Sequence, residues 1–242
     1  MVIPFDGEQI AGVLTLPSPA ATAVALLLHG GPGGSKDGPS DLYVRLAESL
    51  AVAGIASLRF DFIGANESSG DYAQTSASHQ VAQYGHALNW LRTQGFEQVA
   101  VVGESFGGTC ALGGYSRDDV DALVLLWPAI WLLDSVFDQF IADGATEIDG
   151  VAVGPGFFDD MLNHPDREAE VRSVVAPTLL IHGDADGEVP FEQSRKAYEL
   201  LQQPKRMVIV PGAEHCLREP DEQALVFQET TAWLATHMVG KQ

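Results

Sequence analysis

The sequence predicts an α/β domain with a mostly parallel, eight-stranded sheet and helices on both faces. Three observations predict this fold class. Short apolar runs alternate with longer amphipathic stretches along the chain, which is typical of βα units. Apolar runs such as Thr22–Leu28 contain no polar alternation, as expected of strands covered on both faces. The 242 residues, 46% of them hydrophobic, fit a single domain spanning residues 1–242 with one buried core.

The first elements favour antiparallel pairing. Met1–Phe5 and Gln9–Leu16 flank the turn dipeptide Asp6-Gly7, which predicts a hairpin. The apolar strand that follows runs into a glycine-rich loop, and a helix over Asp41–Ala53 ends at a glycine. Further strands are expected over Ile55–Phe60, Gln98–Val102, Ala122–Trp127, Thr178–Ile181 and Arg206–Val210, and further helices over Thr75–Gln94, Phe106–Tyr115, Phe191–Leu201 and Asp221–His237.

One long connection interrupts this alternation. Residues 129–176 contain no evident strand, and a connection of this length far exceeds the usual βα loop. An insertion after the carboxyl end of a strand is where a cap over a pocket would lie, so we expect a small cap here. Its aromatic residues could form the core of the cap or contact a substrate: Trp131, Phe137, Phe140, Phe157 and Phe158.

The charge balance excludes several classes of partner. Asp and Glu number 33 against 13 Lys and Arg, a formal net charge of −20. Such a surface repels phosphate backbones and anionic membranes, so neither a nucleic-acid nor a membrane partner is expected. A small-molecule ligand bound by a monomer or homodimer is expected instead.

Cofactors and export signals are also not expected. The two cysteines, Cys110 and Cys216, do not make a disulfide framework, and no cluster of side chains has metal-ligand spacing. The N-terminal sequence does not show the pattern of a secretory signal, and the longest apolar runs are shorter than the roughly 18–20 residues of a membrane span. The sequence thus predicts a soluble, cytoplasmic protein without metal or cofactor.

A nucleophile is predicted at Ser105. Gly103-Glu104-Ser105-Phe106-Gly107 has the form G-x-S-x-G, preceded by an apolar strand and followed by a helix rich in small residues. In that setting the serine occupies a sharp strand-to-helix turn, and the glycines let strand and helix approach closely. The hydroxyl is then exposed above the sheet, at the positive end of a helix.

A serine hydroxyl needs a base, and the base needs an acid to orient it. Asp184, Asp186 and Glu188 all lie in the loop after the strand Thr178–Ile181, and His215 follows the last strand. Serine, acid and histidine in that chain order, at successive strand ends, predict a catalytic triad. We prefer Asp186 as the acid and expect Asp184 to bond the local backbone of its turn; Glu188 and the earlier Asp134 remain alternatives.

Acyl transfer also needs donors aimed at the developing oxyanion. One is expected from the backbone N–H of Phe106, directly after the nucleophile. The second is expected from Gly31 in the loop His29–Gly33, because Pro32 lacks an N–H. The histidines His29 and His182 are expected to be packing residues.

Five segments carry a family resemblance: HGGPGGSKDG (29–38), LAESLAVAGIASLRFDFIGANESSGDY (46–72), VVGESFGG (101–108), IHGDADGEVP (181–190) and PGAEHCL (211–217). With them, nearly the whole chain resembles the α/β-hydrolase superfamily. Within it, the chain is similar to small bacterial cinnamoyl- and feruloyl-esterase-like hydrolases and serine aminopeptidase-like hydrolases. The resemblance implies a triad of Ser105, Asp186 and His215, an oxyanion hole from Gly31 and Phe106, a small cap, and hydrolysis of carboxylic esters.

Two departures from the family pattern matter. Relatives read G-x-G-x-S after RFDF, whereas this chain reads Gly64-Ala65-Asn66-Glu67-Ser68. The HGGPG segment also resembles proline iminopeptidases, which carry a longer helical cap than this chain can accommodate. We therefore expect an esterase of small alkyl or aryl substrates. An amidase, aminopeptidase, thioesterase or lactonase with the same triad, and a non-catalytic binding protein, are the alternatives.

Overall fold

The computed structural model describes residues 1–164 and 166–238; position 165 of the expected cap and positions 239–242 of the expected domain lie outside the described residues. Eight strands form one sheet in the order β1-β2-β4-β3-β5-β6-β9-β10, which confirms the predicted sheet. The strands are β1 (Val2–Phe5), β2 (Glu8–Thr15), β3 (Ala23–Leu28), β4 (Ala56–Phe60), β5 (Gln98–Glu104), β6 (Ala122–Leu126), β9 (Thr178–Gly183) and β10 (Lys205–Val210).

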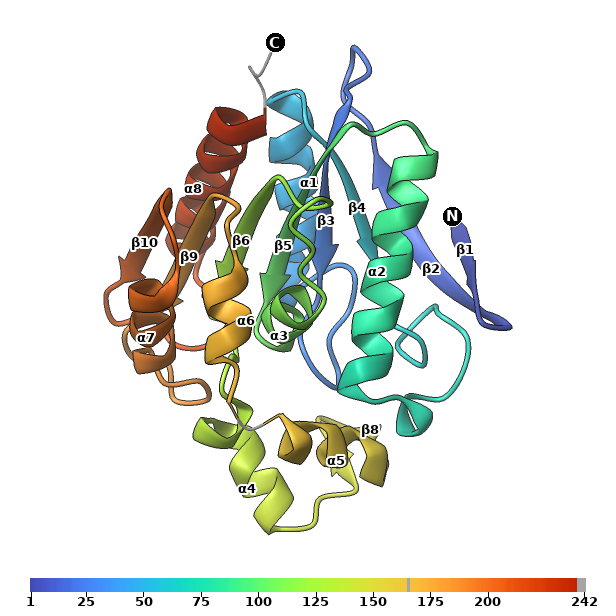
Figure 1. Ribbon diagram of the computed structural model, residues 1–242, viewed down its shortest axis with the longest axis vertical. Helices are drawn as coiled ribbons and strands as arrows, with labels where there is room; N and C mark the ends of the chain where they lie inside the picture. Colours follow the sequence, from blue (N-terminus) through green and yellow to red (C-terminus); the bar gives the residue numbers. More distant parts are fainter. Residues whose placement is uncertain (165, 239–242) are drawn as a thin grey trace.

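Six neighbouring strands are parallel to one another, whereas the pairs β1–β2 and β2–β4 are antiparallel. The β1–β2 hairpin pairs Val2 with Ala11, as the Asp6-Gly7 turn predicted, and β2 also pairs antiparallel with β4. From β4 to β10 every neighbouring pair is parallel. The carboxyl ends of these six strands therefore share one edge of the sheet, the lower edge in Figure 1.

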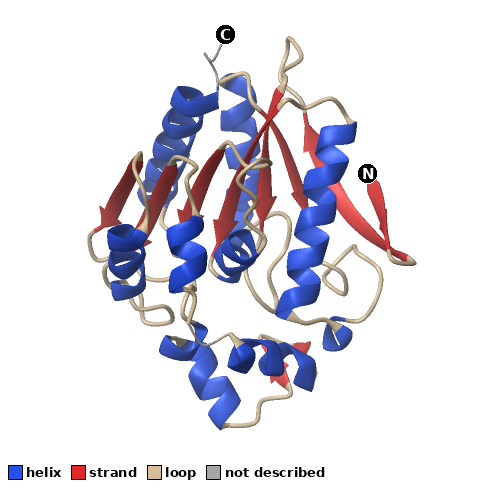
Figure 2. Cartoon of the chain, in the orientation of Figure 1, coloured by secondary structure: helices blue, strands red, loops and turns tan. Residues whose placement is uncertain are grey.

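Helices cover both faces of the sheet (Figures 1 and 2). One face carries α2 (Ala77–Thr93), α3 (Phe106–Gly113), α6 (Glu168–Ser173) and α7 (Glu192–Leu200), and the other carries α1 (Leu42–Val52) and α8 (Pro220–Met238). The helix predicted from Thr75 begins later, because Ser76 is its N-cap and accepts the N–H of His79. None of the helices in the described ranges combines the length and apolarity needed to cross a bilayer.

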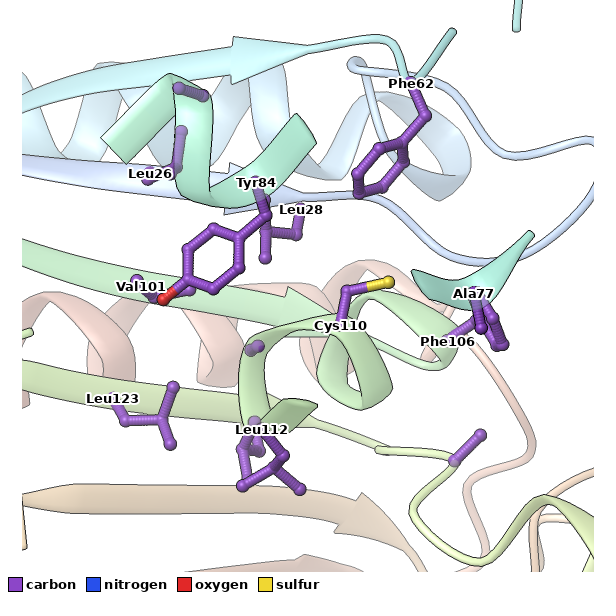
Figure 3. Packing of buried hydrophobic residues seen from close by; sticks show 14 of the residues in the cluster. Leu26, Leu28, Phe62, Ala77, Tyr84, Val101, Phe106, Cys110, Leu112 and Leu123 are labelled. Carbon is purple, nitrogen blue, oxygen red and sulfur yellow. The ribbon is translucent and has the colours of Figure 1, made fainter. Parts of the chain in front are cut away.

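The central strands supply a core on each side. In β3 the side chains of Leu26 and Leu28 pack toward α2 and α3, and that of Leu27 packs toward α1 and α8. Neighbouring residues of a strand point to opposite faces, so an unbroken apolar run fills both cores. Figure 3 shows the first core, where Leu26 and Leu28 lie beside Tyr84 of α2 and Cys110 of α3.

Residues 129–176 fold in two parts. The short helices α4 (Val136–Ala142) and α5 (Pro155–Asn163), with the hairpin β7 (Glu147–Ile148) and β8 (Val151–Ala152) between them, lie beyond the carboxyl edge of the sheet (Figure 1). We call residues 135–163 the cap segment. The expectation that this insertion lacks strands was wrong, because two-residue strands joined by Asp149-Gly150 are too short to give an alternating pattern. The rest of the insertion includes α6, which packs against α3 and α7.

Candidate active site

Ser105 lies at the turn between β5 and α3, as G-x-S-x-G predicted. Its backbone is left-handed (φ 49°, ψ −119°), a conformation that costs a non-glycine residue about 1–3 kcal/mol. A Cβ on Gly107 would collide with the backbone carbonyl of Leu28, and a Cβ on Gly103 would lie 2.5 Å from the carbonyl oxygen of Gly107. Strand, turn and helix are thus packed so closely that only glycine fits at these two positions.

Three predicted site residues come together at the carboxyl edge of the sheet. The Nε2 atom of His215 lies 3.1 Å from the Oγ of Ser105. Its Nδ1 lies 2.7 Å from Oδ2 of Asp186. Because Nδ1 donates its hydrogen to the carboxylate, Nε2 is unprotonated and can accept a hydrogen bond from the serine hydroxyl. Residues separated by 110 positions in the sequence thereby form one hydrogen-bonded chain.

Asp186, and not Asp184, faces the histidine. The Oδ1 of Asp186 accepts the backbone N–H groups of Glu188 and Val189, each at 2.9 Å. Asp184 was expected to bond its own turn; instead, its Oδ1 accepts the N–H of Gly212 at 2.6 Å. It thereby ties the acid loop to the loop of the histidine. Within the described residues no hydrogen bond joins Asp134 to His215, and the exposed Glu188 carboxylate lies 3.9 Å from Nε2 of His215.

The surroundings tune the pKa values of the base and the acid. Burial lowers the pKa of His215, but the hydrogen bond and charge of Asp186, with the charges of Glu188 and Glu104, outweigh burial and raise it above 6.5. Burial raises the pKa of Asp186, but its hydrogen bonds from two histidines and from the Val189 N–H bring it far below the usual range. The acid therefore stays ionised while the base titrates.

Gly31 and Phe106 lie side by side next to the serine. A Cβ built on Gly31 would sit 3.6 Å from the Cβ of Phe106. Among the described residues, no acceptor is bonded to the backbone N–H of either one. Two free donors beside a nucleophile are the arrangement that an oxyanion requires.

Glu104 joins the nucleophile turn to the Gly31 loop. This buried residue is the last of strand β5, and its Oε1 accepts the N–H of Gly30 at 2.7 Å. Its Oε2 accepts the indole N–H of Trp127 at 3.1 Å. Burial raises its pKa, although both hydrogen bonds lower it. Sequence reasoning missed this role, because the variable position of G-x-S-x-G carries no signal of what it will contact.

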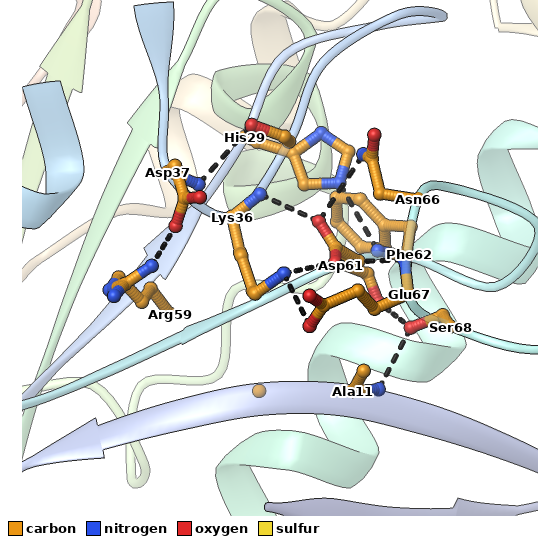
Figure 4. Close-up of polar contacts among 12 residues, drawn as sticks. Ala11, His29, Lys36, Asp37, Arg59, Asp61, Phe62, Asn66, Glu67 and Ser68 are labelled. Carbon is orange, nitrogen blue, oxygen red and sulfur yellow. Dashed lines mark hydrogen bonds and ion pairs between the residues drawn. The ribbon is translucent and has the colours of Figure 1, made fainter. Parts of the chain in front are cut away.

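A buried ion pair fixes the far end of the same loop (Figure 4). The Lys36 ammonium lies 2.8 Å from Oδ2 of Asp61, and the side chains are 8% and 0% exposed. Oδ1 of Asp61 also accepts the backbone N–H of Lys36 at 2.7 Å. His29 is a packing residue, as expected: its Nε2 accepts the N–H of Phe62, and burial lowers its pKa to about 4.

Asn66 accounts for the missing glycine of the family pattern. It adopts a left-handed backbone (φ 42°), which asparagine tolerates better than most residues. Its Nδ2 donates to the carbonyl of Gly34 at 2.8 Å. The substitution thus keeps the turn and adds a bond to the loop that carries Gly31.

A pocket of about 470 Å³ opens over Ser105, between the loops and the cap segment. The cap segment contributes four apolar lining residues, Val136, Phe137, Phe140 and Ile148, and Pro32, Pro39 and Val189 add to them from the loops. The polar lining of the pocket includes Glu104, Asp149, Glu188, His215 and Arg218. Of the cap aromatics, Phe137 and Phe140 face the pocket, whereas Phe157 and Trp131 are buried in packing.

Both cysteines are free thiols. Cys110 is buried in the core, and Cys216 lines the pocket beside the histidine, where burial raises its pKa to about 12. Among the residues with described positions, no three histidine, cysteine or acidic side chains gather as a metal site.

A serine on a strand–helix turn, paired with a histidine at the sheet edge, defines a serine hydrolase of the α/β fold. The family description "alpha/beta hydrolase fold" matches residues 24–164, more than half of the chain, and the chain belongs to this family. The prolyl oligopeptidase family matches residues 145–241.

Curated relatives align over most of the chain at low identity. The uncharacterized protein YfhR of Escherichia coli (strain K12) is 26% identical over 230 residues, which cover 93% of this chain and 75% of YfhR. The acylamino-acid-releasing enzyme of Sus scrofa is 26% identical over 263 residues, which cover 98% of this chain and 35% of that enzyme. This chain thus spans about a third of the larger enzyme.

Solved structures share the fold. Est1E from Butyrivibrio proteoclasticus with bound ferulic acid superposes with a TM-score of 0.84 at 21% identity, covering 98% of this chain and 99% of that one. A monoacylglycerol lipase from Paleococcus ferrophilus gives a TM-score of 0.74 at 22% identity, covering 94% and 99%.

Proposed function

We propose that this protein hydrolyses carboxylic esters of small alkyl or aryl substrates through an acyl-enzyme on Ser105. One observation carries the proposal: His215 bonds Ser105 through Nε2 at 3.1 Å and Asp186 through Nδ1 at 2.7 Å. This is the geometry of a nucleophile, a general base and an orienting acid.

The reaction follows from this geometry in two steps. His215 takes the proton of Ser105 as Oγ attacks the ester carbonyl, and the N–H groups of Gly31 and Phe106 bind the oxyanion. Asp186 stabilises the imidazolium, which then protonates the departing alcohol. Water attacks the acyl-enzyme by the reverse proton route and releases the acid.

The pocket supports a small, apolar acyl or aryl group. Phe137, Phe140 and Ile148 offer aromatic and aliphatic surface opposite the serine. Its acidic lining and the net charge of −20 disfavour substrates that carry several negative charges. Solved structures of similar fold include an esterase with ferulic acid and a monoacylglycerol lipase, which supports an ester substrate.

Hydrolysis of p-nitrophenyl esters by purified protein tests the proposal. Ser105→Ala is expected to lower kcat/KM by about 10⁴–10⁶-fold, because the nucleophile is lost. The wild type should also label with a fluorophosphonate, and the variant should not. A wild type that neither cleaves nor labels would point to a binding protein, and a fully active Ser105→Ala variant would overturn the assignment.

Hydrolysis of an acylated amino acid or peptide amide is the second candidate. The prolyl oligopeptidase match over residues 145–241 and the likeness to an acylamino-acid-releasing enzyme favour it. Matched ester, thioester and amide substrates with one common acyl group separate the two. Under our proposal kcat/KM for the ester exceeds that for the amide by more than the intrinsic difference in reactivity of the two bonds.

A further inference from the structure

His182 is a buried histidine whose two ring nitrogens both have partners. It lies in β9, is 0% exposed, and packs edge-on against the ring of Phe191. Its Nε2 lies 3.1 Å from Oδ2 of Asp186 and 3.1 Å from the carbonyl of Val189. Its Nδ1 lies 2.7 Å from Oγ of Ser194, in α7.

These partners determine where the proton sits. A carboxylate and a carbonyl only accept, so Nε2 of His182 must carry a hydrogen. Ser194 can donate or accept, and in the neutral imidazole its hydroxyl donates to Nδ1. The carboxylate and the carbonyl therefore select the tautomer in which His182 donates toward Asp186, and Ser194 satisfies its other ring nitrogen.

His182 and His215 donate to the same oxygen. Oδ2 of Asp186 accepts Nδ1 of His215 at 2.7 Å and Nε2 of His182 at 3.1 Å, while Oδ1 takes two backbone N–H groups. Four donors occupy the roughly four lone-pair sites of the carboxylate. The Asp186 carboxylate is thus held in place by both His215 and the buried His182, and its charge interacts with both.

We propose that His182 is a positioning residue: with its Nδ1 bonded to Ser194, it holds the Asp186 carboxylate in line with Nδ1 of His215 and takes up part of its charge. This inference rests on the proposed function, in which His215 is the base. It adds to the site a hydrogen-bonded relay that runs from α7 to the nucleophile through Ser194, His182, Asp186, His215 and Ser105.

Other charged groups also face His215. Glu188 and Glu104 raise its pKa, as Asp186 does, and burial lowers it. Arg218 and the Cys216 thiol line the same pocket. Of the groups that face His215, Asp186 bonds His182, whereas Glu188, Glu104, Arg218 and Cys216 do not. A substitution at His182 is therefore expected to act on His215 through Asp186.

The test is an NMR titration of His215, which needs no substrate. Its signal is assigned by comparison with His215→Gln, and Ser194→Ala and His182→Leu are compared with wild type. Removing the second donor concentrates the charge of Asp186 on His215, so the His215 pKa should rise by about 0.5–1 unit in His182→Leu, and by less in Ser194→Ala.

Two variants separate positioning from general damage. His182→Gln keeps an N–H near the place of Nε2 and should restore the wild-type titration. Ser57→Ala removes a fully buried hydroxyl that has no hydrogen-bond partner in the described part of the chain, and should leave it unchanged. If His182→Leu fails to fold, Ser194→Ala and His182→Gln carry the test. If the His215 pKa is unchanged or lower in His182→Leu and in Ser194→Ala, the proposal is overturned.

Kinetics give the second readout. In His182→Leu, kcat/KM should fall by about 10–100-fold, the range typical of residues that orient a reacting group without contacting the substrate. The acid limb of the pH–kcat/KM profile should move to higher pH, because the pKa of His215 rises. A fully active Ser105→Ala variant would overturn the proposed function while leaving the titration result intact, so the two failures are distinguishable.

Discussion

The loops at the sheet edge and the cap segment are held in different ways. The loops are fixed by polar bonds: Glu104 to Gly30 and Lys36 to Asp61, which are buried, and Asp184 to Gly212, which is at the surface. The cap segment meets them mainly through aromatic packing, with Phe137 and Phe157 against Phe106. Directional bonds define position, whereas apolar contacts tolerate repacking. Under the proposed function, the loops hold the reacting groups, and the cap segment determines which substrates fit.

The largest effect is expected where the loops hold the base. Asp186→Asn should lower kcat/KM by about 10⁴-fold, because an amide in place of the carboxylate favours the wrong tautomer of His215. Asp184→Asn is the matched control: its side-chain oxygen can still accept the N–H of Gly212, so activity should stay within about threefold. Equal losses in both variants would reopen the choice of acid.

Next in size is the buried ion pair. Lys36→Met should reduce the free energy of unfolding by about 3 kcal/mol, the lower end of the range for a broken buried ion pair. The loss is at the lower end because Asp61 still accepts a hydrogen bond from the backbone N–H of residue 36. Urea denaturation measures it. Glu67→Gln, at a carboxylate 72% exposed that also contacts Lys36, should cost less than about 1 kcal/mol. Similar losses would show that burial does not govern the strength of this network.

A smaller effect on rate, with a pH signature, is expected at Glu104. An amide can accept from Gly30 or Trp127 but not from both, so Glu104→Gln should lower kcat/KM by about 10–100-fold. In the wild type, kcat/KM is expected to decrease as the pH drops below the pKa of His215, which Asp186, Glu188 and Glu104 raise from its usual value. The charge of Glu104 favours the imidazolium, so its loss should move this acid limb to lower pH. An acid limb that does not shift in Glu104→Gln would show that the charge of Glu104 has no effect on the pKa of His215.

The smallest effect is expected in the cap. Phe137→Ala should raise KM for an aryl ester by about tenfold, because the substrate loses apolar contact with one aromatic ring of the pocket. The value of kcat should be nearly unchanged. Phe158→Ala, a cap aromatic outside the pocket lining, should leave KM unaltered. If kcat fell as strongly as KM rose, the cap would be positioning the reaction as well as the substrate.

Local pattern was enough to predict the fold and to single out two of the three candidate site residues. Ser105 is set by G-x-S-x-G after an apolar strand, and His215 by its place after the last strand. Asp186 could be preferred over Asp184 but not chosen, because two residues of separation in a loop do not reveal which carboxylate faces the histidine.

Residue patterns along the chain were enough to predict the alternation of strands and helices and the glycines of the nucleophile turn, because periodicity and steric limits act between near neighbours. The folded structure was needed to see that Glu104 bonds Gly30, that Asn66 keeps a left-handed turn and bonds Gly34, and that His182 and His215 share one oxygen of Asp186. These contacts join residues brought together by the parallel sheet, and a buried polar group takes whichever partner the fold delivers.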